Sequence, residues 1–333
     1  MSGLKSNICS DYQASDSQWL SYCKSCSYTT FFQTPMWVRA FEQWSEGKIK
    51  ADTRIIEFSD GKKVLFPLAI KKKGWLRIGI SMPASTYGGW LTLEKLQPEH
   101  ACSLIKYIRK KYKDLILVEN PYAPLLSAIS IGNARDIGTS SIDLSQGMEG
   151  VTKNSKYYHR KNLKTAEKCG VTIKVVEDFS KWLEYYDVYK ESISRWKGRK
   201  IFSGVKYDLR LFEIIHKLDP SLRKLWTADL EGKAIAGILC FYWNEHAVAW
   251  NGAGLSEYFH CRPNNLLYQH AIEHACKNDY HWFDCNPSGS LEGVSSFKQG
   301  LGAKMLQTRI IDQRSFTRKI ATLARSHKLH YNC

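Results

Sequence analysis

Two halves of this chain repeat one succession of structural signals, and this repeat limits the possible folds more than any other feature. The segments SDGKKVLF and LEGKAIAG each read as a hairpin in which a charged residue and a glycine make the turn. In each half a further strand, a glycine-bearing segment, an amphipathic helix and another strand follow. The repeat predicts an α+β fold of two tandem units, each with a mixed, mostly antiparallel sheet flanked by helices.

The length of 333 residues fits two such units. We expect the first unit to cover residues 1–150 and the second to cover 151–315, followed by a basic tail at 316–333. Apolar periodicity and prolines at helix starts predict the helices. They span 35–44, 98–111, 155–169, 180–196, 207–218 and 263–277.

Composition predicts a cytoplasmic protein. Hydrophobic residues make up 44% of the chain, but there is no run of about 18 apolar residues to form a transmembrane helix. The N-terminus lacks the apolar centre of a signal peptide. The ten cysteines are scattered, which indicates free thiols. We expect no metal site, because the isolated pair Cys23 and Cys26 supplies only two of the four ligands that structural zinc needs.

Basic residues concentrate in the second half of a chain whose net charge is +16. Between residues 153 and 168 there are six of them and a single glutamate, and further clusters lie at 190–210 and 309–333. A one-sided positive field predicts a polyanionic partner such as nucleic acid or a phosphorylated cofactor. The alternative is a solvated basic surface with no partner.

The segment SSFKQGLGAKM places Phe297 and Lys298 side by side, shortly before two glycines. Asp284 and Asn286 lie upstream, at the end of an expected strand. A fixed cation beside a reacting carbonyl stabilises the oxyanion of acyl transfer, and we expect a glycine turn to aim Lys298 at such a carbonyl from an open groove wall. Asp284 or Asn286 would position or deprotonate an amine, and the alternative for Asp284 is a cap that orders the Asn-Pro turn. The alternative for Lys298 is a surface lysine whose stem packs on Phe297.

The run from Arg262 to Lys304 resembles the closing region of the FemABX-like transferases, a branch of the GNAT superfamily built from two GNAT-like units. The shared elements are Pro263 with a following Leu-Leu pair, the Phe-Asp pair ending at Asp284, and the Phe297-Lys298 pair with Gly302. The segments FFQTPMWVRAF and YGG are similar to the first unit of the same family. This resemblance implies a transferase that moves an aminoacyl group from tRNA, or an acyl group from a thioester, onto an amine.

The resemblance also implies roles for individual residues. Lys298 would hold the donor end and the developing charge, with Phe297, Asp284 and Asn286 around it. The first unit would bind the acceptor and the second unit the donor. The expected acceptor residues are Trp37, Arg39, Tyr87 and Gly88, and the expected donor residues are Arg160, Lys161, Lys164, Arg262, Asn264 and Asn265.

Two donors remain open. Enzymes that use acyl-CoA cradle its pyrophosphate on backbone N–H groups of a glycine-rich loop, whereas the corresponding segment, 261–265, has no glycine and contains Pro263, which lacks an N–H group. We therefore expect aminoacyl-tRNA as the co-substrate, with no tightly bound cofactor. The alternative is an acyl-CoA-dependent acetyltransferase that acts on an amino sugar or small metabolite. The acceptor itself, a small molecule or a cell-envelope precursor, stays open, and so does a binding module that has lost catalysis.

Overall fold

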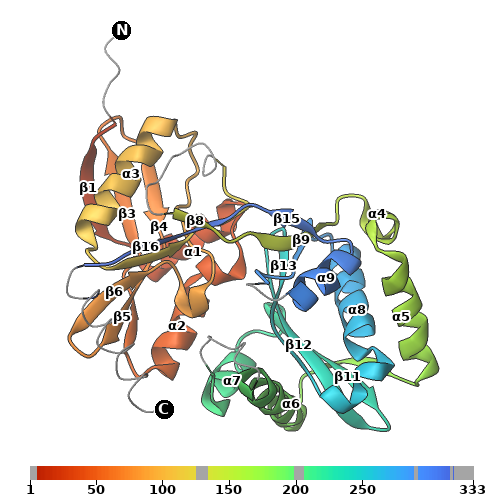
Figure 1. Cartoon of the computed structure of the whole chain (residues 1–333). Coiled ribbons are helices and arrows are strands. Elements are labelled where there is room, and N and C mark those ends of the chain that lie inside the picture. Colours follow the sequence, from red (N-terminus) through yellow and green to blue (C-terminus); the bar gives the residue numbers. More distant parts are fainter. Residues whose placement is uncertain (1–5, 125–133, 199–205, 289–291, 316–317, 319–333) are drawn as a thin grey trace. The chain divides into compact units, whose positions relative to one another are not determined.

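The computed structural model describes residues 6–124, 134–198, 206–288, 292–315 and 318 (Figure 1). The chain forms two compact units. Unit 1 combines Met1–Ile137 with Gln307–Cys333, and unit 2 is Gly138–Leu306. Within the described residues, no helix is both long enough and apolar enough to cross a bilayer.

Unit 1 contains two sheets. Strands β1, β3 and β4 form a small antiparallel sheet, and the larger sheet has the order β2-β5-β6-β7-β16-β8. The strands are β1 (Ile8–Gln13), β2 (Ile49–Ala51), β3 (Arg54–Phe58), β4 (Lys63–Phe66), β5 (Ala69–Lys73), β6 (Leu76–Ile80), β7 (Leu115–Val118), β8 (Ala134–Asp136) and β16 (Arg309–Gln313). The helices are α1 (Asp16–Ser25), α2 (Pro35–Trp44) and α3 (Pro98–Lys111).

Unit 2 has one sheet of order β10-β11-β12-β13-β14-β9-β15. Its strands are β9 (Thr139–Asp143), β10 (Thr172–Val176), β11 (Arg223–Leu230), β12 (Lys233–Trp243), β13 (His246–Gly254), β14 (Trp282–Asp284) and β15 (Lys304–Leu306). Its helices are α4 (Gly147–Asn154), α5 (Tyr157–Lys168), α6 (Phe179–Gly198), α7 (Leu209–His216), α8 (Pro263–Lys277) and α9 (Glu292–Gly300).

The predicted repeat is confirmed as a shared topology. In each unit antiparallel strands lead into a helix, and the strand after that helix pairs in parallel with the strand before it. The parallel pairs are β6 with β7, connected through α3, and β13 with β14, connected through α8. All other strand pairs in the two large sheets are antiparallel. The fold is thus α+β, with mixed, mostly antiparallel sheets flanked by helices, as expected from the sequence.

The unit boundaries differ from the expected division at residue 150. Strand β9 pairs with β14 and β15, so the second unit already begins at Gly138. Strand β16 pairs with β7 and β8 and returns the chain to unit 1, which Figure 1 shows as a blue strand beside an olive one. Backbone pairing therefore sets the boundary, and hydrophobic pattern alone does not reveal which strands pair. Most of the expected tail at 316–333 lies outside the described residues.

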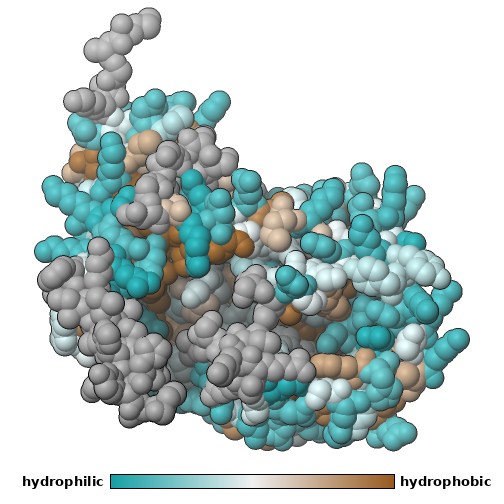
Figure 2. All heavy atoms as spheres, in the orientation of Figure 1, coloured by the Kyte–Doolittle hydropathy of each residue, from teal (hydrophilic) through white to brown (hydrophobic). Residues whose placement is uncertain are grey.

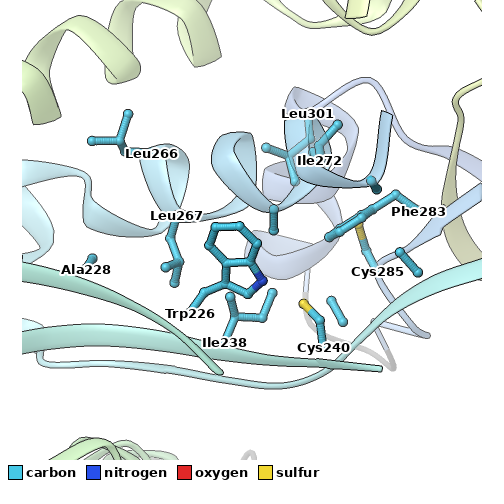
Figure 3. Packing of buried hydrophobic residues seen from close by; sticks show 14 of the residues in the cluster. Trp226, Ala228, Ile238, Cys240, Leu266, Leu267, Ile272, Phe283, Cys285 and Leu301 are labelled. Carbon is cyan, nitrogen blue, oxygen red and sulfur yellow. The ribbon is translucent and has the colours of Figure 1, made fainter. Parts of the chain in front are cut away.

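The core of unit 2 lies between α8 and the sheet. Leu267 and Ile272 on α8 are fully buried, and Figure 3 shows Leu267 pointing toward Trp226 and Ile238 from the strands. Pro263 occupies the first turn of α8, where a missing N–H group costs no helical hydrogen bond. Helix α6 packs on β12 and β13. These helices fix the position of the strands whose ends carry the site below.

All six predicted helices are present, but α1, α4 and α9 were not predicted. Residues 292–300 form α9, so Lys298 lies in the last turn of a helix instead of on a glycine turn. Gly302 follows with φ of 95°, a left-handed conformation that suits glycine after a helix. The two glycines that suggested a turn around Lys298 thus mark the end of α9 and the residues after it.

We predict that Gly237→Ala destabilises unit 2. A Cβ atom at Gly237 on β12 would lie 2.4 Å from the Tyr185 ring of α6 and 3.1 Å from the Trp226 carbonyl oxygen. Overpacking of this kind costs about 1–3 kcal/mol, measured by urea unfolding. Gly293→Ala on α9 is the control, because no atom lies within 4 Å of its added Cβ and alanine favours a helix. Equal stability of Gly237→Ala and the wild type would contradict the packing of α6 described here.

Candidate functional site

Strands β13 and β14 part at the point where the candidate site lies. They pair over three positions only, from His246 with Trp282 to Val248 with Asp284. Beyond this point β14 ends, whereas β13 continues to Gly254. The register of β13 against β12 also shifts after Ala249, where Trp250 is the extra residue of a bulge. Backbone groups at this divergence are no longer covered by a neighbouring β14 strand.

Asp284, the last residue of β14, is fully buried and orders the turn that follows it. Its Oδ1 atom accepts hydrogen bonds from the Asn286 backbone N–H at 2.6 Å and from the Thr139 hydroxyl at 3.0 Å. Thr139 lies on β9, the next strand in the sheet. Buried polar groups need such partners, and these two bonds make Asp284 a clamp between β9 and the loop after β14.

The side chain of Asn286 joins the loop after β14 to β13 through one hydrogen bond. Its φ of 60° is left-handed, a conformation that asparagine tolerates better than most residues. Its Nδ2 atom donates to the Ala249 carbonyl oxygen at 2.6 Å. The backbone carbonyl of Asn286 is thereby held in a fixed direction, and this carbonyl is the group that receives Lys298.

The Lys298 ammonium is buried at this divergence. The residue is only 5% exposed, and its Nζ atom donates to the Asn286 carbonyl oxygen at 2.6 Å. The expected open groove wall is therefore wrong, as is the alternative of a surface lysine. An ammonium has three donors, and among the described residues only this one acceptor is bonded to it. Two donors thus remain for an oxygen atom that enters the site.

Burial lowers the pKa of Lys298 below the ordinary lysine value of 10.5. The cause is loss of hydration of the ammonium, and nearby Cys285 and Asp284 act weakly in the opposite direction. Cys285 is itself buried, which raises the pKa of its thiol to about 12 and keeps it protonated. A buried lysine with a single backbone acceptor is costly to maintain, which makes it a candidate functional residue.

The sequence predicts that Phe297 supports Lys298 in the site. Phe297 packs on the core of unit 2 and lies edge-on to Tyr268 of α8, with ring centroids 5.2 Å apart. This aromatic pair attaches α9 to α8. Phe297 therefore positions the helix that carries Lys298.

The start of α8 lies close to the end of β13. Arg262 immediately precedes the helix with φ of 54° and is exposed, and no described residue forms an ion pair with it. The amide nitrogen of the half-buried Asn264 would lie 3.4 Å from a Cβ placed at Gly254. Both side chains are placed where a ligand phosphate could meet the positive end of a helix. These two residues remain donor candidates.

Asn265, the third donor candidate on α8, has a structural role instead. It is buried, and its Nδ2 atom lies 2.9 Å from Nδ1 of His159 on α5. Because an amide nitrogen only donates, Nδ1 of His159 accepts and its Nε2–H faces Gln269 at 3.3 Å. Burial lowers the pKa of His159, which favours this neutral form. The pair joins α5 to α8 and offers nothing to a ligand.

Helix α5 carries the remaining donor candidates. Lys161 and Lys164 are exposed, and no described residue pairs with either. Arg160 is exposed too, but it donates to the carbonyl oxygens of Thr152 and Ser155 at the end of α4, at 3.1 and 3.3 Å. The surface over α4 and α5, at the right of Figure 2, is mainly hydrophilic. Lys161 and Lys164 are therefore available to a polyanion, whereas Arg160 is partly occupied.

The acceptor candidates in unit 1 do not form a binding surface in this structure. Trp37 is fully buried, and its indole N–H donates to Thr86 Oγ1 at 3.1 Å. Arg39 is paired with Asp16 at 2.8 Å and with Glu42 at 2.5 Å. The hydrogen bond to Asp16, with help from Glu42, raises the pKa of Arg39 above its ordinary value. Trp37 is therefore a core residue, and Arg39 already has two carboxylate partners. Neither is placed as the expected acceptor-binding residue.

Tyr87 and Gly88 are also packed inside unit 1. Tyr87 is 1% exposed, with an edge contact to Phe32. Gly88 donates its N–H to the Val118 carbonyl oxygen at 2.8 Å, and an added Cβ would lie 2.5 Å from the side chain of Ser81. The glycine is required for close approach of two backbone segments, so the YGG motif supports the core instead of lining a binding surface.

Thr139 is a site residue that sequence reasoning missed. The segment around it reads correctly as a strand, but its hydroxyl gains meaning only from the pairing of β9 with β14. The bulge at Trp250 was missed for a similar reason, because it depends on the register of two strands. Among the described residues no group of three or more histidine, cysteine, aspartate or glutamate side chains is arranged to hold a metal ion.

Part of the chain matches a known protein family. Residues 153–299 match the family model described as acetyltransferase (GNAT) domain, and this segment includes Asp284, Asn286 and Lys298. No curated protein matches the chain in sequence.

Solved structures share the fold over nearly the whole chain. FemX aligns with a TM-score of 0.66 at 12% identity, covering 91% of this chain and 97% of FemX. The C-terminal domain of a protein assigned as lysylphosphatidylglycerol synthetase from Agrobacterium fabrum aligns with a TM-score of 0.53 at 13% identity, covering 94% and 97%. L-PGS from Bacillus licheniformis aligns with a TM-score of 0.51 at 16% identity, covering 88% and 96%. At such identities these alignments establish the fold alone.

The family match covers the segment that builds the Lys298 site, and the complete two-unit fold is that of FemX. Residues 153–299 therefore match a GNAT acetyltransferase domain, which supports an acyltransferase, and the fold of the chain is similar to that of FemX.

Proposed function

We propose that this protein forms an amide bond by transferring an aminoacyl group from aminoacyl-tRNA to an amine, with Lys298 at the reacting centre. The acceptor nitrogen attacks the ester carbonyl carbon and gives a tetrahedral oxyanion. The bond from this carbon to the ribose oxygen then breaks, and the ribose oxygen leaves with a proton that comes from the amine. The observation that carries the proposal is the buried ammonium of Lys298 with two uncommitted donors.

In this mechanism Lys298 stabilises the oxyanion. An ammonium in a water-poor site interacts strongly with a developing negative charge. The hydrogen bond to the Asn286 carbonyl fixes the direction of Nζ before the substrate binds, so little reorganisation is needed during the reaction. Asp284 acts as a positioning residue, because its Oδ1 atom is engaged in ordering the Asn286 turn. We assign no general base.

The preference for tRNA over CoA is supported by uncommitted positive charge. Lys161 and Lys164 on α5 project without a described partner, as does Arg262 at the start of α8. Each phosphate that such residues neutralise adds affinity for a nucleic acid. FemX and L-PGS are among the structures with a similar fold, and this likeness is compatible with aminoacyl transfer. Aminoacyl-tRNA would place the reaction in the cytoplasm.

An acyl-CoA donor is the second candidate, and one observation favours it. The left-handed φ of Arg262 gives the chain a bend that a glycine would normally provide before α8. The backbone N–H groups of this helix start and the Arg262 side chain would then receive a pyrophosphate. For either donor we propose unit 2 as the donor-binding unit and unit 1 as the acceptor-binding unit, with a small amine or a cell-envelope precursor as acceptor.

We predict that Lys298→Met lowers the single-turnover rate constant about a hundred- to a thousandfold at saturating donor and acceptor. This is the range expected for loss of one oxyanion-stabilising group. Lys298→Arg should recover only part of the rate, because a planar guanidinium cannot replace a point charge. Lys304→Met, which removes an exposed lysine of β15 in the same unit, is the control. Wild-type turnover by Lys298→Met would exclude the proposed role.

The lowered pKa of Lys298 gives a prediction for stability. The unfolded chain keeps a lysine proton up to about pH 10.5, whereas the folded protein releases it earlier. Stability of the wild type relative to Lys298→Met should therefore rise as the pH increases from neutral toward 10.5. Thermal melting of both proteins across this range measures the difference. A constant difference would mean that folding does not shift this pKa, and a difference that falls with pH would mean that the fold favours the ammonium form; either result would contradict the prediction.

A third prediction distinguishes the donors. If the donor is aminoacyl-tRNA, binding of tRNA should fall by roughly tenfold or more between low and moderate salt. The double variant Lys161→Glu and Lys164→Glu should weaken it further. The variant Lys106→Glu and Lys110→Glu changes the net charge equally on exposed positions of α3 and serves as the control. Tight binding of CoA that depends on Arg262 but not on α5, together with weak tRNA binding, would favour the second donor.

A further inference from the structure

The hairpin of β5 and β6 carries an exposed tryptophan that the proposed reaction does not use. Trp75 lies in the two-residue turn between the strands, where Gly74 has φ of 60°, and it is 73% exposed. Among the described residues no aromatic ring or cation packs on it. The hairpin is drawn at the lower left of unit 1 in Figure 1. A single exposed apolar side chain is ordinary on a protein surface, so the significance of Trp75 depends on the charges around it.

Positive charges adjoin this tryptophan in a row across three strands. Lys72 of β5 is directly opposite Arg77 of β6, and its backbone N–H donates to the carbonyl of Lys48, before β2. Lys50 of β2 lies two residues after Lys48. It is therefore on the same face of the sheet as Lys48, because alternate residues of an extended chain point to the same side. All four side chains are exposed. The hairpin and the neighbouring β2 segment thus present two cations each on one face.

No described acidic residue neutralises this row. Lys48, Lys50, Lys72 and Arg77 have no ion pair within the described part of the chain. The sequence from residue 61 to residue 93 contains neither aspartate nor glutamate. Like charges that lie directly opposite each other in a sheet are destabilising. An arrangement that works against folding and lacks an internal counter-charge is best explained by an external polyanion.

We propose that the β5–β6 hairpin docks this protein on a membrane surface that contains anionic phospholipid. Tryptophan prefers the headgroup level of a bilayer, where its ring is partly buried and its N–H meets polar groups. Lysine and arginine next to it attract anionic headgroups. A surface for single-stranded nucleic acid would instead combine several aromatic rings with its cations, and β2, β5 and β6 contain no aromatic residue. This inference does not depend on the proposed transferase reaction.

The test is flotation of the full-length protein with two kinds of vesicle, made of phosphatidylcholine alone or of phosphatidylcholine with phosphatidylglycerol. The wild type should partition into the anionic vesicles and be released by high salt. The double variant Lys72→Glu and Arg77→Glu should lower the partition coefficient at least about tenfold, because each basic residue near an anionic surface contributes roughly fivefold. Trp75→Ala should lower it several-fold.

Two further variants protect the interpretation. The neutral pair Lys72→Gln and Arg77→Gln changes the hairpin less and should lose roughly half of the effect on a logarithmic scale. The pair Lys106→Glu and Lys110→Glu on α3 alters the net charge of the same unit by the same amount and should partition within twofold of the wild type.

Three results would overturn the proposal. They are a wild type that does not float with anionic vesicles, a control pair on α3 that loses as much binding as the hairpin pair, and hairpin variants that lose RNA binding while they keep vesicle binding.

Discussion

The buried ammonium group of Lys298 requires a specific set of hydrogen bonds in unit 2. Lys298 needs an acceptor where water is scarce, and it finds the carbonyl of Asn286. The direction of that carbonyl is fixed because Asn286 adopts a left-handed conformation. The Asp284 carboxylate stabilises this conformation by accepting a hydrogen bond from the Asn286 backbone N–H. The carboxylate in turn depends on the Thr139 hydroxyl. These hydrogen bonds depend on one another. Loss of any one of them would leave a buried charged group with too few hydrogen-bond partners.

This dependence explains why the second unit begins before α4. Thr139 lies on β9, and only a strand paired with β14 can bring its hydroxyl to Asp284. Strand β15, which follows the helix that carries Lys298, pairs with the other edge of β9. The segment at 139–143 therefore holds both ends of the loop and helix between β14 and β15. Assigning it to the first unit, as a division at residue 150 does, would remove the support of the site.

Local patterns in the sequence were sufficient to predict what depends on local physics. Helix α8 was predicted to its end residues, since Pro263 and the periodic apolar residues that follow act within one segment. The importance of Lys298 was also predicted, but its surroundings were not. Its burial depends on α9, Asn286 and Asp284, which meet only after β14 has paired with its neighbours. The predictions that Trp37 and Tyr87 bind the acceptor were wrong. A motif shared with a family does not distinguish a binding residue from a core residue.

In a chain with a net charge of +16, the cations available to a ligand differ from the structural cations in their internal partners. Arg39 was predicted to bind the acceptor and Arg160 the donor. In the structure, carboxylates pair with Arg39, and carbonyl oxygens at the end of α4 accept hydrogen bonds from Arg160. Lys161, Lys164 and Arg262 lack such partners within the described chain, and so does the row that begins with Lys72. A charge that the fold has not neutralised keeps its full attraction for a ligand. Binding surfaces in a basic protein are therefore better located by the absence of internal counter-charges than by the density of lysine and arginine.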